Sequence, residues 1–106
     1  MPESSVNEDG AWEQQPVRWN IQVNGTVEGM GFRAFIYTLA TRLNLCGFVA
    51  SQPGTLAIEI EGARSSLGEF LEELWLGAPR RAHIDQLSCH SGPSQGAAGF
   101  EIVGKD

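Results

Sequence analysis

Apolar and polar residues alternate along two stretches of this chain. The apolar positions are Val17, Trp19, Ile21 and Val23 in the first stretch and Leu56, Ile58 and Ile60 in the second. A period of two places successive side chains on opposite faces of a strand. Each stretch is therefore predicted to be a strand with one face in the core and one in solvent.

Three weaker patterns predict the remaining strands. The segment GFVAS, residues 47–51, is short and apolar, and the turn residues QPGT follow it. The irregular stretch 82–91 contains Ile84 and Leu87, which fall on opposite faces of an ideal strand unless a β-bulge brings them together. Residues 100–102 are predicted to form a short closing edge strand.

Two stretches carry apolar residues at helical spacing. These residues are Phe32, Phe35, Ile36, Leu39, Ala40 and Leu43 in the first stretch and Leu67, Phe70, Leu71 and Leu74 in the second. Each set forms one apolar stripe, which predicts an amphipathic helix. We expect Gly47 to end the first helix, and Ser66 with Glu69 to form a capping box at the start of the second.

The order of these elements is β-α-β-β-α-β with a short edge strand. Because each helix and each clear strand has one apolar face, we predict an α+β fold, a ferredoxin-like sandwich with two helices on one face of an antiparallel sheet. Residues 1–16 are polar and end at a proline, so they are expected to be a disordered lead-in to a domain spanning residues 17–106.

Composition narrows the possible partners. The chain has 106 residues, enough for one domain, and a net charge of −6 with scattered Lys and Arg residues, which excludes a typical nucleic-acid surface. Signal-peptide and membrane-span patterns are absent, so we expect a cytoplasmic location and no membrane contact. The two cysteines, Cys46 and Cys89, lack zinc-site spacing and are expected to be reduced, buried thiols.

Candidate chemistry centres on the loop NGTVEGMGFRAF, residues 24–35. Gly25, Gly29 and Gly31 allow successive backbone N–H groups to turn inward just before a helix begins. A helix N-terminus attracts anions, and Arg33 in the first turn can add a bidentate contact to phosphate. A plain glycine-rich turn with an exposed arginine is the alternative interpretation.

The segments GTVEGMGFRAF, LATRLNLCGFVAS and LAIEIEG resemble the acylphosphatase family pattern G-x-V-x-G-V-x-F-R followed by L-x-G-x-V-x-N. The resemblance runs from about Trp19 to the end of the chain. Within the family, GMGFRAFIYTLA and PRRAHID are most similar to the N-terminal acylphosphatase-like domain of HypF, the carbamoyltransferase that matures nickel–iron hydrogenases.

This resemblance implies the sandwich fold and the hydrolysis of carboxyl-phosphate anhydrides, or of carbamoyl phosphate in the context of HypF, without a metal or cofactor. It assigns phosphate binding to the loop residues Glu28, Gly29, Met30, Gly31 and Phe32 and to Arg33. Catalysis would then come from positioning and preorganised charge without a covalent nucleophile. In the context of HypF, the partners would be downstream domains of a larger maturation protein.

The sequence departs from the family at Ser51, which stands where the family has the asparagine that orients the attacking water. A hydroxyl cannot offer the separate donor and acceptor of a carboxamide, so weakened catalysis is expected. Gln52 has the required chemistry, but in a regular strand it points to the opposite face. Glu28 replaces a common glutamine and is expected to face solvent.

Two other functions compete with hydrolysis. A non-catalytic module that binds phosphate or carbamoyl phosphate fits the loss of the asparagine at Ser51. An RNA-binding module of the same fold would need aromatic residues on the central strands and a basic face, which are missing. We expect His83 and His90 to be ordinary core or surface residues and Asp85, Glu59 and Glu61 to lie on a solvated face.

Overall fold

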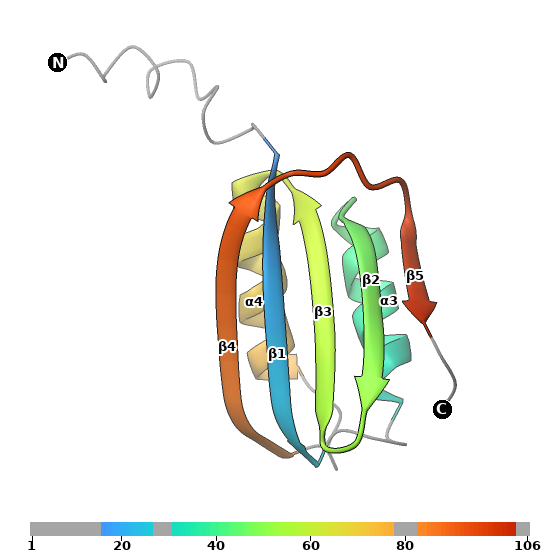
Figure 1. The fold of residues 1–106 in the computed structure, drawn as a ribbon, viewed down its shortest axis with the longest axis vertical. Helices are drawn as coiled ribbons and strands as arrows, with labels where there is room; N and C mark the ends of the chain where they lie inside the picture. Colours follow the sequence, from blue (N-terminus) through green and yellow to red (C-terminus); the bar gives the residue numbers. More distant parts are fainter. Residues whose placement is uncertain (1–15, 27–30, 78–82, 104–106) are drawn as a thin grey trace, which may run out of the picture.

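The computed structural model describes residues 16–26, 31–77 and 83–103. Its strands and helices follow the predicted order along the chain (Figure 1). They are β1 (Val17–Thr26), α3 (Phe32–Arg42), β2 (Cys46–Gln52), β3 (Thr55–Gly62), α4 (Arg64–Gly77), β4 (His83–Pro93) and β5 (Phe100–Val103). The predicted lead-in lies outside the described residues, except for Pro16.

The strands form one five-stranded sheet in the order β4-β1-β3-β2-β5. β1 pairs antiparallel with both β3 and β4, and β2 pairs antiparallel with β3. The short strand β5 pairs parallel with β2 at the edge, which makes the sheet mixed. The predicted ferredoxin-like sandwich is confirmed, with the parallel edge strand as an addition to its antiparallel part.

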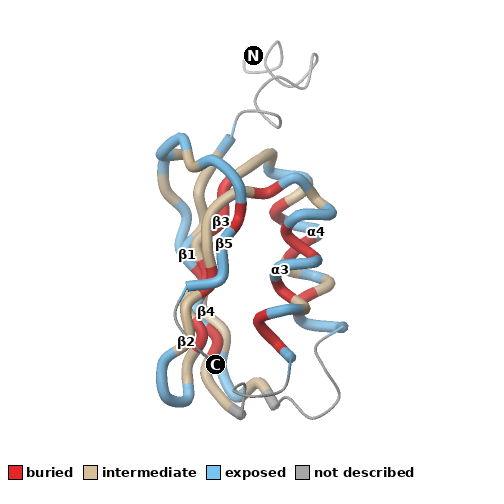
Figure 2. The backbone as a smooth tube through the Cα atoms, turned by 90° about the vertical axis from the view of Figure 1, so that its right-hand side faces the viewer, coloured by how far each residue is buried: buried red, intermediate tan, exposed pale blue. Residues whose placement is uncertain are grey.

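Both helices cover the same face of the sheet, and the buried residues lie between the two layers (Figure 2). Helix α3 contacts β2 and β5, and α4 contacts β3. The buried apolar residues are Ile21, Val23, Phe32, Ile36, Leu39, Ala40, Leu45, Val49, Leu56, Ile58, Ile60, Leu67, Phe70, Leu74 and Phe100. Their burial follows the predicted alternation on the strands and the predicted stripes on the helices.

The predicted bulge on the irregular strand is confirmed. Asn24 lies opposite Gln86, whereas its neighbour Gly25 lies opposite Ile84, so Asp85 is the extra residue on β4. The bulge lets Ile84 and Leu87 both pack against the core.

The end of α3 differs from the prediction. Asn44 takes a left-handed φ of 60°. Its N–H donates to the carbonyl of Thr41 at 3.1 Å, and the N–H of Leu45 donates to the carbonyl of Ala40 at 2.9 Å, which is the pattern of a Schellman motif. Gly47 lies in β2, so the prediction that it ends the helix was wrong.

The start of α4 also differs from the prediction. The helix begins at Arg64, and the N–H of Leu67 donates to the carbonyl of Ala63 at 3.0 Å. Ser66 therefore lies inside the first turn, and the prediction that Ser66 caps the helix was wrong.

Candidate functional site

The N-terminus of α3 is open. Gly31 occupies the N-cap position with φ 71° and ψ 13°, a left-handed conformation that glycine adopts without strain. Among the described residues, no side chain caps the first backbone N–H groups, and the first turn has no acidic residue. These N–H groups and the positive end of the helix dipole can therefore receive an anion.

Arg33 lies in the first turn of α3 and is buried, with 9% of its surface exposed. Its Nη1 atom is out of contact with solvent. The alternative of an exposed arginine on a simple turn does not fit this burial. A guanidinium held at a helix N-terminus adds a fixed positive charge to the partial charge of the backbone.

Ser51 lies near the end of β2, on the face of the sheet that the helices cover. Val49, two residues earlier on the same face, is fully buried. Ser51 pairs with Leu56 on β3, and Leu56 pairs with Val23 on β1, so these three residues form one row across the sheet. Val23 lies three residues before the end of β1, which places Ser51 at the same end of the sheet as the start of α3 (Figure 1).

Gln52 does not replace the missing amide on this face. β2 pairs with β3 without a break as far as Gln52, which lies opposite Thr55 and is exposed. Successive strand residues alternate between faces, so Gln52 lies on the face away from the helices. Among the predicted water-positioning groups, the hydroxyl of Ser51 is the one on the helix side.

Two hydrogen bonds hold this end of the sheet together. The N–H of Gly25 donates to the carbonyl of Gly54 at 3.0 Å, and Oγ1 of Thr55 donates to Oδ1 of Asn24 at 2.9 Å. They join the end of β1, from which the glycine loop departs, to the turn between β2 and β3.

The predicted phosphate cradle is described only in part. Gly31, Phe32 and Arg33 lie at the start of α3, and the side chain of Phe32 belongs to the core. Glu28, Gly29 and Met30 lie outside the described residues, so their predicted role and the predicted exposure of Glu28 stay predictions.

The opposite face of the sheet carries a charged network that the sequence pattern did not predict. Arg18 donates through Nε and Nη2 to Oε1 of Glu59 at 2.9 and 2.7 Å, and through Nη1 to Oε1 of Glu61 at 2.8 Å. Glu61 is only 5% exposed, so its expected place on a solvated face was wrong. A signal was present, because Arg18 and Glu61 occupy opposed positions once β1 and β3 are paired.

The other candidate groups lie apart from this site. Both cysteines are free, and Cys89 is exposed, so the expectation of a buried thiol was wrong for Cys89. Within the described ranges, no group of three His, Cys, Asp or Glu side chains is placed to hold a metal ion. No helix in these ranges is long and apolar enough to cross a membrane.

Residues 19–102 match the family model for acylphosphatase. A carbamoyltransferase HypF2 of Cupriavidus necator is 39% identical over 88 residues, which are 82% of this chain and 11% of that protein. An acylphosphatase of Nocardioides sp. is 33% identical over 84 residues, which are 78% of this chain and 84% of that protein.

Solved structures give the same relationship. A full-length HypF in the phosphate- and nucleotide-bound form has a TM-score of 0.80 and 32% identity, covering 86% of this chain and 12% of that one. An acylphosphatase of Bacillus subtilis has a TM-score of 0.78 and 29% identity, covering 82% of this chain and 98% of that one.

The two kinds of relative differ in length. This chain spans 11% to 12% of the HypF relatives in sequence and in structure, but it spans most of each acylphosphatase. The match over residues 19–102 covers nearly all of the described fold. The chain therefore belongs to the acylphosphatase family.

Proposed function

We propose that this domain binds the phosphate of an acyl phosphate or of carbamoyl phosphate at the start of α3 and hydrolyses it slowly. The observation that carries the proposal is the burial of Arg33 in the first turn of a helix whose N-terminus has no side-chain cap. A guanidinium in the first turn and the backbone N–H groups at a helix start both favour an anion with several oxygens.

In this proposal the loop residues 28–32 donate backbone hydrogen bonds and Arg33 neutralises charge on the phosphoryl oxygens. Fixed donors stabilise the charge that develops in the transition state because they need little reorganisation there. The attacking water would be oriented from the end of β2, so the reaction would need no covalent enzyme intermediate and no cofactor.

Ser51 sets the expected rate. Its hydroxyl is shorter than the asparagine amide of the family pattern and supplies fewer hydrogen bonds to water and phosphate. Losing a contact that positions the reacting water typically costs about a hundredfold in rate. We therefore expect phosphate affinity to be kept better than turnover.

The same residue favours a second candidate, a non-catalytic module that binds phosphate or carbamoyl phosphate. Relatives named carbamoyltransferase HypF carry this domain as a small part of a longer chain. In such a setting the domain would act together with downstream domains of a hydrogenase maturation protein, and binding without turnover would be sufficient.

One assay with two readouts separates these functions. Benzoyl phosphate hydrolysis is followed with the wild-type chain, and inorganic phosphate is titrated as inhibitor and as ligand in ¹H–¹⁵N NMR. The enzyme proposal expects hydrolysis above background that phosphate inhibits, with the first amide shifts at Gly31 and Arg33. Shifts at these amides without hydrolysis would favour the binding module, and shifts centred elsewhere would overturn both candidates.

A further inference from the structure

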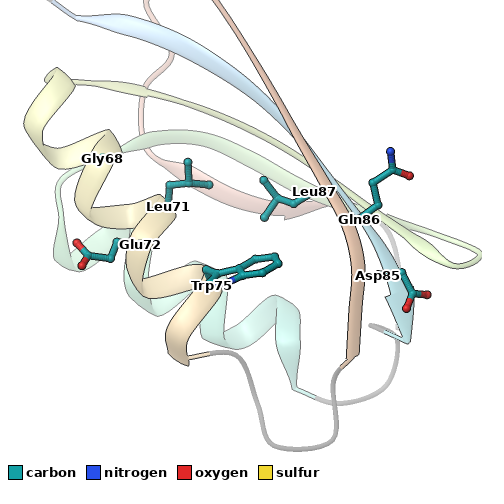
Figure 3. Close-up of a pocket in the computed structure, with 7 residues that line it drawn as sticks. All are labelled: Gly68, Leu71, Glu72, Trp75, Asp85, Gln86 and Leu87. Atoms are coloured by element: carbon teal, nitrogen blue, oxygen red, sulfur yellow. The ribbon is translucent and has the colours of Figure 1, made fainter.

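A cleft of about 500 Å³ lies between α4 and the edge strand β4. Neither Arg33 nor Ser51 lines it, so it is separate from the candidate phosphate site. Leu71 and Trp75 of α4 point across it toward Leu87 of β4 (Figure 3). Leu71 and Leu87 also pack against the core, so the floor of the cleft is continuous with the folded interior. The cleft is thus an apolar surface supported by rigid elements.

Gly68 helps to keep this cleft open. It lies one turn before Leu71 and two turns before Trp75 on the same side of α4. A Cβ atom at Gly68 would meet nothing within 4 Å, so close packing does not require glycine there. Glycine inside a helix is destabilising relative to alanine. At this position its missing side chain leaves open space beside Leu71.

Trp75 leaves a large aromatic surface beside the cleft. Its exposed fraction is 56%, although tryptophan side chains are on average largely buried in folded proteins. The ring lies beneath Leu87 on the helix side of β4 (Figure 3). Rigid aromatic side chains next to a concave apolar surface are typical anchors for a partner.

β4 offers main-chain groups next to the same cleft. Within the described residues it pairs with β1 alone and lies at the end of the sheet. Its outer N–H and C=O groups form an edge to which an extended peptide can add as another strand. A strand added there would direct alternate side chains toward the helix side, where the cleft lies.

The margin of the cleft on α4 carries negative charge from Glu72. Glu72 on α4 and Asp85 on β4 line it, and both carboxylates point outward from the apolar centre (Figure 3). The whole chain has a net charge of −6. Like charges repel, so this margin disfavours a second copy of the chain and favours a partner with basic residues beside an apolar one.

We propose that the α4–β4 cleft is a docking site for an extended segment of another polypeptide. The segment adds to the edge of β4, inserts one apolar side chain between Trp75, Leu71 and Leu87, and carries basic residues at alternate positions on the same face, one of them beside Glu72. Main-chain pairing supplies affinity, and the cleft and its acidic margin supply selectivity.

The probe is the peptide acetyl-Thr-Lys-Thr-Phe-Thr-Lys-Thr-amide, which places Phe and both Lys side chains on one face of a strand, titrated into the ¹⁵N-labelled chain. Its first control carries glutamate in place of each lysine, and its second carries N-methyl groups on alternate backbone nitrogens to block strand pairing. We expect the basic peptide to shift the Trp75 indole N–H and the β4 amides and to slow hydrogen exchange along β4. Each control should bind about tenfold more weakly or worse.

Matched variants locate the site on the protein. Trp75→Ala should weaken peptide binding about tenfold, whereas Leu76→Ala, which removes a side chain that is 74% exposed and outside the cleft, should not. Gly68→Leu should fill the cleft, block binding and leave the fold intact, because the space there is open. Glu72→Gln should weaken binding by about threefold, and Glu69→Gln, also exposed on α4, should change it little.

Three results would overturn the proposal. Equal affinity for the lysine and glutamate peptides would remove the charge selectivity, and equal affinity for the N-methylated peptide would remove the strand addition. Protection of β4 amides that rises with protein concentration in the absence of peptide, together with dimers in analytical ultracentrifugation, would show that a second copy fills the cleft.

Discussion

The Nη1 atom of Arg18 lies 2.8 Å from Oε1 of Glu61 on the face of the sheet away from the helices, where Glu61 is buried and Arg18 is partly buried. Glu61 also accepts backbone hydrogen bonds from the N–H of Gln95 at 2.8 Å and the N–H of Ala97 at 2.6 Å. One carboxylate thus joins β1, β3 and the segment that leads from β4 to β5.

Removal of this carboxylate should destabilise the fold strongly. Glu61→Ala leaves Nη1 of Arg18 and the N–H groups of Gln95 and Ala97 without their acceptor, while Arg18 keeps Glu59 as a partner. We expect a loss of about 3 kcal/mol in the free energy of unfolding. Urea denaturation checks the value. Glu101→Ala, at an exposed position on β5, is the control and should stay within about 0.5 kcal/mol of wild type.

The same group should make stability depend on acid pH. Burial opposes the charge on Glu61, but hydrogen bonds from Gln95 N–H, Arg18 and Ala97 N–H outweigh it and lower the pKa of the carboxyl below its ordinary 4.5. A lowered folded-state pKa adds stability that is complete above the unfolded-state value and is lost as pH falls through the folded-state value.

The stability gap between wild type and Glu61→Gln should therefore be constant above pH 4.5 and narrow as the pH falls further. Urea denaturation at a series of pH values measures this gap. A gap that stays constant down to pH 2 would show that the charge of Glu61 contributes nothing.

Arg33→Ala should reduce phosphate affinity by about tenfold or more, because the guanidinium supplies a charge-assisted bidentate contact. Arg33→Lys should restore only part of the affinity, since an ammonium lacks the planar fork. Phosphate titrations by NMR or calorimetry provide the measurement. Arg42→Ala, at the other end of α3 where Arg42 pairs with Glu73, is the matched control, and full rescue by lysine would contradict the bidentate contact.

Ser51→Asn should raise benzoyl phosphate hydrolysis by about tenfold, a gain of roughly 1.4 kcal/mol in transition-state stabilisation. The phosphate affinity should change little, because Arg33 and the loop carry that contact. Gln52→Asn, at the neighbouring exposed position on the other face of the sheet, is the control and should leave kcat unchanged. An unchanged kcat in Ser51→Asn would favour the binding module over the enzyme.

Gly47→Ala should destabilise the fold by at least about 2 kcal/mol. Gly47 has φ 137°, and an added Cβ would overlap the carbonyl oxygen of Glu59 on the neighbouring strand. Thermal unfolding of this variant can be compared with Gly96→Ala, which has a positive φ but open space around its Cβ. The difference between the two variants reports the steric clash together with the greater backbone strain of an alanine at φ 137° than at φ 77°.

The fold could be predicted from the sequence because each sheet face has a different environment. Helices cover one face, so Ile21 and Val23 on β1, and Leu56 and Ile58 on β3, alternate with polar neighbours. The bulge was also predictable, since Ile84 and Leu87 could reach one core only with an extra residue between them.

Local ends and long-range pairs were harder to predict. Asn44 and Gly47 both adopt a positive φ. The sequence does not show which of them ends α3 and which lies where two strands approach closely. The burial of Glu61 was not predicted because its hydrogen-bond donors, Arg18 and the N–H of Gln95, come from segments far apart in the chain, and their meeting depends on strand register.

The residues of the candidate site could be predicted from the sequence, but the burial of their side chains could not. The resemblance to acylphosphatases pointed to Arg33 and Ser51, and strand alternation placed Gln52 on the other face. The burial of Arg33 could not be predicted, because it depends on how tightly the start of α3 packs against the sheet.

The contacts of Glu61 with the segment before β5 also bear on the order in which the chain assembles. Strand β5 pairs with β2, more than fifty residues earlier, so closing this loop carries a high entropic cost. Once β1 and β3 have paired, Arg18 holds the carboxylate of Glu61 in place, and this carboxylate can accept the N–H groups of Gln95 and Ala97. We therefore expect the parallel edge of the sheet to form after β1 and β3 have paired, with the carboxylate of Glu61 holding the segment that leads to β5.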